Sequence, residues 1–333
     1  MQSEQCFLFI LIACIIGAAF PCSDVSAQAG KRRVPGLGDG TGIEFVVIVV
    51  RDIEAAKDTY RDVLGFKFPP KGDVDVKPVG IKESNAPFEK GGYLEFVAVD
   101  DLAKAKQNRP AYLEFLAQRG EGTEGIIFEI SSAEETVGFL RSRGFEVTDP
   151  RPHSVLRVVA FGGPYPKHLA ARLRFFEFAD RAVRQERIRQ AVAEGKRRQV
   201  NTAVGIEAVW VVVDDLNAAV RAYSSIGLSA GKKREFRHLG ANGQEIETGR
   251  GKIVLLKPES KGGRAASFLA EQGEGIMGLS VELSSLRTAR TLLEKNTNRK
   301  FSTYAGAYGD SILIPAEIAH GVWIEMFQKS KAR

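Results

Sequence analysis

Few residues of this 333-residue chain could carry catalytic chemistry. The three cysteines, Cys6, Cys14 and Cys22, all lie near the N-terminus, so a chain cut after them would hold neither a disulfide nor a thiol nucleophile. The chain contains no GxSxG, HExxH or Walker sequence, on which whole classes of hydrolases, metalloproteases and nucleotide-binding enzymes depend. The remaining candidates are histidines and glutamates, whose chemistry is metal binding or proton transfer.

Two histidines and a glutamate in the last third of the chain form one candidate site. His238, His320 and Glu325 supply two imidazoles and a carboxylate, a donor set that suits a divalent transition metal. His320 and Glu325 are an odd number of positions apart, and on a regular strand such residues point to opposite faces. We therefore predict no metal site here, and the trio stays open as an alternative.

Two GEG sequences, at 120–122 and 273–275, could in principle bind phosphate. Glycine lets backbone amides approach an anion closely, and helix N-termini attract negative charge. Each GEG precedes an apolar strand-like segment, however, and phosphate loops lead into a helix. The order predicts two tight loops that enter strands.

The same sequences reveal a duplication. FLAQRGEG at 115–122 returns as FLAEQGEG at 268–275, and VVIVVRDIEAAKDTY at 46–60 is answered by VWVVVDDLNAAVRAY at 209–223. A unit of roughly 150 residues therefore occurs twice. After each GEG comes another apolar strand, polar turn and amphipathic helix, so each unit divides again, and four modules begin near Gly42, Thr123, Gly205 and Ile276.

Local patterns in the first module agree with this division. Residues 46–50 are all apolar, as expected for a strand that is covered on both faces. Ile53, Ala56 and Tyr60 follow at helical spacing, and Gly65 suits the position just after a helix. The sequence predicts a strand, a helix and further strands in each module.

The string GIEFVVIVVRDIEAAKDTYRDVLGFKF at 42–68 resembles the opening of the vicinal oxygen chelate superfamily, which includes glyoxalases, epimerases, extradiol dioxygenases and antibiotic-binding resistance proteins. Residues 93–147 are more narrowly similar to its glyoxalase-like subgroup, and the resemblance runs from Gly42 to Gln328. It implies an α+β fold of four βαβββ modules in two tandem glyoxalase-like domains, each a U-shaped mixed sheet with flanking helices. The implied segments are domain one, 42–180 (modules 42–100 and 123–180), a basic linker helix, 181–202, and domain two, 203–328 (modules 203–258 and 274–328).

The resemblance also implies where metal ligands would stand. Metal-dependent members carry a ligand, usually His or Gln, on the first strand of each module, seven residues before the turn acid, and often a Glu on the last strand. The first-strand positions here are Phe45, Gly125, Ala208 and Gly278. None can bind a metal, so the implied site is degenerate and these four residues would line an apolar ligand pocket instead. No cofactor is predicted, and oxygen-only binding of a divalent metal such as Mg²⁺ stays open.

Carboxylates are retained at most of the matching last-strand positions. The matches are Glu95, Glu177, Val254 and Glu325, and the three glutamates are the candidate catalytic residues. If Glu95 and Glu177 face each other across the domain-one cleft, their repulsion raises one pKa, and the pair could serve as acid and base. The alternative is that the glutamates are ordinary strand residues facing solvent.

Two functions follow from this pattern. The first is the binding of a small, partly apolar molecule in a domain cleft, and the second is a lyase, isomerase or dioxygenase with migrated metal ligands or a glutamate acid–base pair. A third possibility is partner binding through the basic linker. Four modules can complete both clefts within one chain, so we expect a monomer.

The N-terminus predicts export. Residues 7–20 are apolar, and Ala27-Gln28-Ala29 suits signal-peptide cleavage after Ala29. The expected location is the periplasm or outside the cell; an N-terminal membrane anchor, or a lipoprotein read from Leu11–Cys14, stays open. Cleavage would change the net charge from +6 to +8, because residues 1–29 contain two acids and no base.

The basic stretch at 181–199 lacks interleaved aromatic residues, which favours a solvated linker over a nucleic-acid surface.

Overall fold

The computed structural model describes residues 37, 40–69, 74–76, 79–153 and 155–330. The predicted signal peptide, residues 1–29, lies outside them. The described residues belong to one compact unit, which contains both sheets described below. Over the described residues, no helix combines the length and the apolar character needed to cross a bilayer.

Domain one contains two modules. Their elements are β1 (Gly42–Val50), α1 (Ile53–Asp58) continued by a π-helical turn (Thr59–Val63), β2 (Val74–Val76), β3 (Ile81–Pro87), β4 (Tyr93–Val99), then α2 (Leu102–Asn108) and α3 (Pro110–Arg119), then β5 (Gly122–Glu129), α4 (Ala133–Ser142), β6 (Arg151–His153), β7 (Leu156–Ala160) and β8 (Arg172–Phe178). The helix α5 (Arg181–Ala193) follows.

Domain two repeats the order. Its elements are β9 (Ala203–Val212), α6 (Leu216–Ser225), β10 (Ser229–Phe236), a 3₁₀ turn (Arg237–Leu239), β11 (Ala241–Glu247), β12 (Lys252–Pro258), α7 (Arg264–Gln272), β13 (Gly275–Leu283), α8 (Leu286–Thr297), β14 (Tyr304–Ala305), β15 (Asp310–Ile314) and β16 (Trp323–Gln328). The predicted βαβββ order is confirmed four times, and so is the α+β fold class.

Each domain folds into one eight-stranded mixed sheet. The strand orders are β2-β3-β4-β1-β5-β8-β7-β6 and β10-β11-β12-β9-β13-β16-β15-β14. The first strands of the two modules pair antiparallel at the centre, β1 with β5 and β9 with β13, and each also pairs in parallel with the last strand of its own module. The first and last strands of all four modules are thereby neighbours, where inward side chains can meet.

The polar turn after each first strand begins a helix. The Asp52 carboxylate accepts hydrogen bonds from the backbone N–H groups of Glu54 and Ala55, at 2.9 and 3.1 Å, so it caps α1. Ser132, Asp215 and Ser285 cap α4, α6 and α8 in the same way. Gly65 has φ of 75°, which fits the predicted end of the first helix.

The GEG sequences form tight loops before strands, as predicted. Gly120 and Gly273 end α3 and α7 with φ of 75° and 72°. Glu121 then accepts a hydrogen bond from the backbone N–H of Arg51 at 2.7 Å, and Glu274 accepts one from that of Asp214 at 2.9 Å. Each repeated glutamate therefore holds the loop to the turn that follows the first strand of its own domain.

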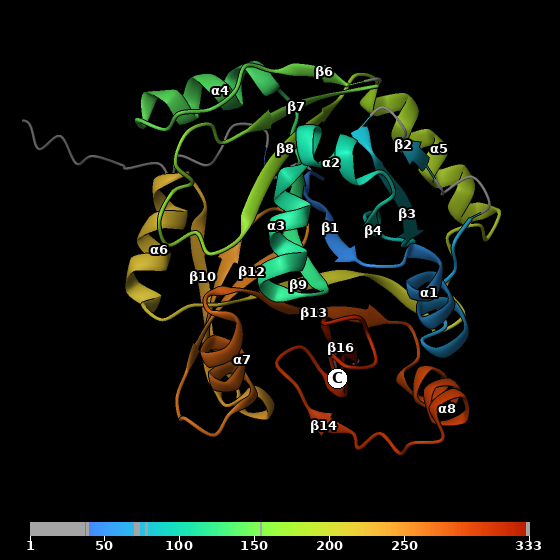
Figure 1. Ribbon diagram of the computed structural model, residues 1–333. Coiled ribbons are helices and arrows are strands. Elements are labelled where there is room, and N and C mark those ends of the chain that lie inside the picture. The colour runs from blue at the N-terminus through green and yellow to red at the C-terminus, as the bar shows by residue number, and fades with distance from the viewer. Residues whose placement is uncertain (1–36, 38–39, 70–73, 77–78, 154, 331–333) are drawn as a thin grey trace, which may run out of the picture. The chain divides into compact units, whose positions relative to one another are not determined.

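The two faces of each sheet have separate apolar clusters. We call the face covered by α3 or α7 the inner face. α3 packs against β1 and β5, and α7 packs against β9, β12 and β13 (Figure 1). Each inner face has its own cluster, while the other faces of both sheets share one large core with α1, α4, α6 and α8. The inner faces are therefore where the two domains can differ without disturbing the shared core.

The two domains exchange hydrogen bonds through the tyrosines of the repeat. The buried hydroxyl of Tyr60 on domain one donates to the carbonyl oxygen of Ala319 on domain two, at 3.1 Å. The hydroxyl of Tyr223 on domain two donates to that of Leu169 on domain one, at 2.7 Å. This reciprocity gives a structural reason for the tyrosine at the end of the first helix in both copies.

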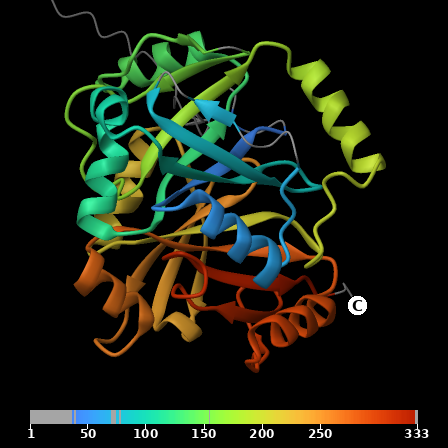
Figure 2. The ribbon, with the colours of Figure 1, turned by 45° about the vertical axis from the view of Figure 1, so that its right-hand side comes forward.

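The basic linker is a helix, as predicted, but part of its charge is paired. Figure 2 shows α5 in yellow-green at the upper right. Arg184 forms ion pairs with the buried carboxylates of Glu44 and Glu129, and Arg250 of domain two joins the same two carboxylates. Burial raises the pKa of Glu44, and the two guanidinium groups oppose that shift. No residue of α5 is buried, but Arg184 anchors this end of the expected solvated linker to both domains.

Candidate functional site

The inner face of domain one is filled with aromatic rings at the predicted pocket position. Phe45 is 2% exposed, stacks on Tyr93 with ring centres 4.4 Å apart, and meets the edge of Phe176 at 5.6 Å. Tyr112 of α3 belongs to the same cluster. Phe45 thus lies on the predicted face, but it contributes to packing there.

The other three predicted pocket residues are small for structural reasons. A Cβ atom on Gly278 would lie 2.1 Å from the carbonyl oxygen of Trp323, and one on Gly125 would lie 3.0 Å from that of Arg172. The two glycines therefore allow the parallel last strand to approach. Ala208 is buried on the inner face of domain two beside Trp210 and Phe236.

These positions do not fit the metal that the superfamily implies. Phe, Gly, Ala and Gly offer no side-chain donor, and within the part of the chain that the structure describes no group of three or more His, Cys, Asp and Glu residues could hold a metal ion.

Glu95 and Glu177 do not face each other, so the predicted acid–base pair is wrong. Glu95 shares the inner face of β4 with Tyr93. Glu177 points to the opposite face of the sheet, where it accepts a hydrogen bond from the backbone N–H of Ala133 at 3.0 Å and pairs with Arg157. Its role is to fix the start of α4.

Strand register shows how the match failed. β5 and β8 place Ile127 beside Arg174, whereas β13 and β16 place Ser280 beside Glu325. In domain two, Gln328 accepts a hydrogen bond from the backbone N–H of Leu286, the residue that begins α8, just as Glu177 does at α4. Glu177 therefore corresponds to Gln328, and Arg174 corresponds to Glu325. The predicted match was off by three residues.

The inner face of domain one therefore carries both a carboxylate, Glu95, and a guanidinium, Arg174. Burial raises the pKa of the Glu95 carboxyl well above its usual range, Glu83 raises it further, and Arg174 opposes the shift. Nη2 of Arg174 lies 3.1 Å from both carboxylate oxygens of Glu124, to which it donates. Arg174 is thus already paired with a carboxylate of the protein itself.

Domain two places a carboxylate among neutral donors. Glu325 is fully buried, and its two oxygens accept hydrogen bonds from Ser280 Oγ at 2.7 Å and from the Tyr304 hydroxyl at 3.1 Å. Ser280 in turn accepts one from Nε1 of Trp210 at 3.0 Å. Burial raises the pKa of Glu325, and the hydrogen bonds from Ser280 and Tyr304 partly oppose this.

His238 lies beside this carboxylate. Its Nε2 is 3.9 Å from Glu325, too far for a hydrogen bond, and has no other hydrogen-bond partner among the described residues. The side chain is 12% exposed, and its ring centre is 4.5 Å from that of Tyr304. Burial lowers the imidazole pKa to about 4, and the nearby charge of Arg264 adds to the shift, so His238 is neutral near pH 7.

His320 lies elsewhere, so the structure brings together only two members of the predicted trio. Its Nδ1 is 2.8 Å from Glu121 and its Nε2 is 3.1 Å from the Thr59 hydroxyl, both in domain one. The site instead gains Tyr304 and Ser280, which sequence reasoning missed. Ser280 could have been found from the register of β13 with β16, whereas the short strand β14, which begins at Tyr304, carries no sequence signal that points to Glu325.

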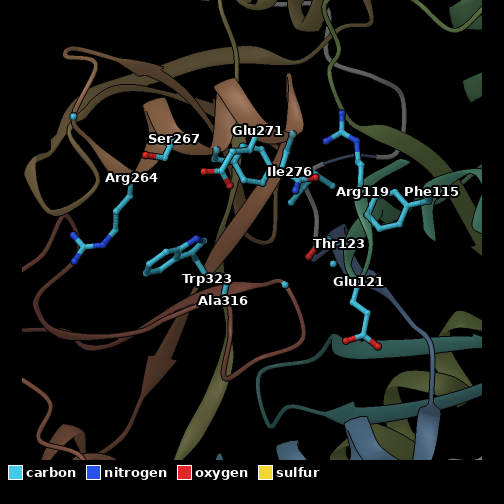
Figure 3. A pocket seen from close by; sticks show the side chains of 15 residues that line it. Phe115, Arg119, Glu121, Thr123, Arg264, Ser267, Glu271, Ile276, Ala316 and Trp323 are labelled. Atoms are coloured by element: carbon cyan, nitrogen blue, oxygen red, sulfur yellow. The ribbon is translucent and has the colours of Figure 1, made fainter. Parts of the chain in front are cut away.

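A pocket of about 440 Å³ is lined by Trp323 and Arg264, which are neighbours of the Glu325–His238 cluster. Figure 3 shows Arg264 and Trp323 of domain two on one side of it, and Phe115 and Arg119 at the end of α3 on the other. Trp323 stands two residues before Glu325 on β16. Arg264 donates to the backbone carbonyl of His238 at 2.5 Å, and its guanidinium lies 5.5 Å from the centre of the Trp323 ring. Trp323 and Arg264 therefore connect the pocket to the buried cluster.

A second pocket of about 340 Å³ is its counterpart in domain one. It lies between α3 and the 165–172 segment, whereas the larger pocket lies between α7 and the 316–323 segment. Arg172 replaces Trp323 and forms an ion pair with Glu124 at 3.3 Å. The duplication has therefore produced two related pockets with different linings.

Comparison with known families decides the identity of the fold. A family model described as a glyoxalase-like domain matches residues 44–227, which is 184 of the 333 residues (227 − 44 + 1). The chain belongs to the glyoxalase-like domain family. The match covers domain one, α5, β9 and α6.

Solved structures agree on the fold of this glyoxalase-like protein. A mutant of 4-hydroxymandelate synthase from Streptomyces coelicolor has a TM-score of 0.60 and 13% identity, over 90% of this chain and 94% of that one. A hypothetical protein from Staphylococcus aureus has a TM-score of 0.57 and 9% identity, over 86% of this chain and 99% of that one. No curated protein matches the chain. At these identities the similarity concerns fold alone.

Within the glyoxalase-like fold, the domain-two cluster is suited to two tasks. A buried carboxylate beside a neutral imidazole can hydrogen-bond to a polar group of a ligand, or move a proton to and from it. The pocket beside the cluster supplies the surface on which the rest of such a molecule would lie.

Proposed function

We propose that this glyoxalase-like protein binds a small, partly apolar molecule in domain two, in the pocket between α3, α7 and β16. The observation that carries the proposal is the position of Glu325. Glu325 stands two residues after Trp323, which lines the pocket, so the two side chains lie on the same face of β16, while the equivalent Arg174 of domain one is hydrogen-bonded to Glu124. Domain two therefore keeps an inward group that is held by neutral donors.

The size and lining of the pocket support the same proposal. Ligand sites commonly occupy roughly 300–1,000 Å³ and combine apolar walls with a few placed polar groups. Here Phe115, Phe268 and Trp323 provide apolar surface, and Ser267 and Arg264 provide hydrogen-bond donors. A molecule with an apolar body and one polar end would match this combination of apolar walls and hydrogen-bond donors.

We also propose that the protein works in the periplasm or outside the cell, after cleavage following Ala29. The support is the apolar run at 7–20 and the Ala27-Gln28-Ala29 sequence. N-terminal sequencing of the protein recovered from each cell fraction tests this, and a mature chain that begins at Gly30 is expected. A chain that keeps residues 1–29 and stays in the membrane fraction would contradict cleavage and favour the anchor.

Binding can be tested with N-phenyl-1-naphthylamine, a neutral aromatic probe that fluoresces in apolar surroundings. Saturable binding is expected, and Trp323→Ala should weaken it about tenfold, since an aromatic wall contributes on the order of 1–2 kcal/mol. Glu95→Gln, on the inner face of domain one, is the matched control and should leave the affinity unchanged. Absence of saturable binding to the folded protein, or equal affinity in Trp323→Ala, would refute the proposal.

A second candidate function is metal-free proton transfer by a lyase or isomerase. The specific observation in its favour is the 3.9 Å approach of neutral His238 to Glu325, in a cluster next to Trp323 and Arg264, which line the pocket. Exchange of protons beside a carbonyl group, followed by NMR in D₂O over a panel of ketones and keto acids, tests it. Exchange that is lost in Glu325→Gln would support catalysis, and exchange equal in wild type and variant would exclude this residue as the base.

A further inference from the structure

We propose that the ligand of the domain-two pocket is an organic anion, bound between Arg119 of domain one and Arg264 of domain two with its planar apolar part against Trp323. This inference rests on the proposed function, because it names the class of molecule that the same site takes. The site would then be composite, with each domain supplying one of the two cations.

Arg119 is a cation without a carboxylate partner. It is the last residue of α3, and its Nη2 donates to the backbone carbonyl of Glu274 at 2.5 Å. No ion pair of Arg119 is present among the described residues, and burial lowers its pKa, which means that the surroundings disfavour its charge. An anion beside it would offset that cost.

Arg264 is the second such cation, at the start of α7. Its contacts are the carbonyl oxygen of His238 and the face of Trp323, both uncharged at pH 7. Over residues 155–330 it has no carboxylate partner either. A guanidinium can bind a carboxylate or sulfonate with two parallel hydrogen bonds, and a planar ligand can lie on the neighbouring indole.

The two glutamates that line the pocket do not pair with either arginine among the described residues. Glu121 accepts hydrogen bonds from the Arg51 backbone and lies 2.8 Å from His320, so its carboxylate is already engaged. Glu271 on α7 is exposed and has no ion pair among the described residues. Neither glutamate forms an ion pair with Arg119 or Arg264 among the described residues, so both guanidinium groups keep N–H donors for a ligand anion.

A buried hydroxyl gives independent support. Thr123 is 4% exposed, lines the pocket at the start of β5, and its Oγ1 has no hydrogen-bond partner among the described residues. Burying a hydroxyl without a partner is unfavourable. An oxyanion held by Arg119 would accept a hydrogen bond from it, because Arg119 and Thr123 line the same pocket.

Arg119 and Thr123 line the domain-one pocket as well, so the difference between the two pockets lies in their other arginine. The last-strand arginine of the domain-one pocket, Arg172, forms an ion pair with Glu124, which also binds Arg174. That carboxylate satisfies both cations within the protein. In the domain-two pocket no carboxylate of the described residues does this for Arg264.

The test uses two fluorescent probes with the same aromatic skeleton. 8-Anilino-1-naphthalenesulfonate carries an anionic group, and N-phenyl-1-naphthylamine lacks it. Arg119→Gln and Arg264→Gln should each weaken the sulfonate about tenfold and leave the neutral probe unchanged, as expected for a lost hydrogen bond to a charged group. Arg119→Lys should recover part of the loss, and Glu271→Gln should tighten the sulfonate alone. Arg237→Gln, an exposed arginine of domain two, is the control.

The outcomes separate the two proposals. If the neutral probe binds and responds to Trp323→Ala, but neither arginine variant discriminates between the probes, the anion proposal is overturned and the proposed function stands. If neither probe binds saturably, both fall. Far-ultraviolet circular dichroism and thermal unfolding of each variant show whether a loss reflects unfolding, and a variant that unfolds is replaced by its lysine form.

Discussion

The two inner faces of this molecule descend from one sequence and now differ in what fills them. At the position where domain one carries Phe45, stacked on Tyr93, domain two carries Ala208. Where domain one carries Arg174, bonded to Glu124, domain two carries Glu325, bonded to Ser280 and Tyr304. The comparison teaches that one framework accommodates two different sets of inward side chains, with stacked aromatic rings in domain one and a carboxylate held by neutral donors in domain two.

The framework around these residues changed much less. Both domains keep the capping acid after the first strand, the glycine that admits the last strand, and the glutamate of the GEG loop. These residues shape the backbone, and the residues that differ are side chains on the inner faces. Four experiments test this difference between the inner faces of the two domains.

The largest expected effect on stability comes from a substitution that removes packing on the inner face of domain one. Phe45→Ala removes a ring that is 2% exposed and touches two other aromatic rings, so it should lower the free energy of unfolding by about 3–5 kcal/mol. Urea unfolding followed by circular dichroism measures this. A loss below about 1 kcal/mol would mean that the inner face of domain one is not a packed core and would remove the contrast.

The second effect is a pH dependence of the free energy of unfolding, and it comes from His238 in domain two. Unfolded His238 takes up a proton below its ordinary pKa of 6.5, but the folded imidazole does so only below about 4. The unfolded state therefore binds more protons in this window, and stability falls as pH falls from 6.5 to about 4, by about 3 kcal/mol from this residue.

His238→Gln tests this, because the variant should lack that part of the pH dependence. Urea unfolding of wild type and variant at several pH values gives the difference. Curves that stay parallel across the window would show that the imidazole is not buried as a neutral group.

The third effect is a pH dependence of stability with the opposite sign, and it comes from Glu95 in domain one. The pKa of Glu95 is raised in the folded protein, so folding becomes less favourable as pH rises above 4.5 and the carboxyl ionises. Glu95→Gln should be more stable than wild type near pH 8, by about 1 kcal/mol, with the difference vanishing below about pH 4. Thermal unfolding across this pH range checks it. A variant less stable than wild type near pH 8 would mean that ionised Glu95 is stabilised by Arg174.

The smallest effect concerns one hydrogen bond. Tyr304→Phe removes a donor to Glu325 and should cost about 1 kcal/mol. Tyr93→Phe is the matched change in domain one, where no carboxylate accepts a hydrogen bond from that hydroxyl among the described residues, and it should be nearly neutral. Equal losses in urea unfolding would contradict the assignment of Tyr304 to the Glu325 cluster.

Much of the fold could be predicted because its signals are local or repeated. The four modules follow from the repeats, and the turn residues Asp52, Ser132, Asp215 and Ser285 mark where helices begin. The site was harder, because its residues are brought together by strand register. Glu177 was matched three residues too late, since the segment before β8 differs in length from that before β16.

Two further features of the site have no local signal. His238 approaches Glu325 through a 3₁₀ turn that no periodicity reveals. The filling of the inner faces by α3 and α7 depends on tertiary packing, which a repeated string alone does not specify. The sequence therefore predicts which strands meet, and the structure is needed to show which side chains face each other between them.

The reciprocal bonds of Tyr60 and Tyr223 have a consequence for how this chain arose. Each tyrosine reaches a loop of the opposite copy, which is the pattern found across the two-fold axis of a symmetric dimer, where each subunit gives and receives the same contact. The polypeptide is thus arranged like two subunits joined end to end. Once α5 covalently joined them, identical subunits were no longer required, and a mutation could alter one partner while its twin stayed as it was. A single chain of this kind can therefore hold an asymmetry between its two halves that a dimer of identical subunits cannot encode.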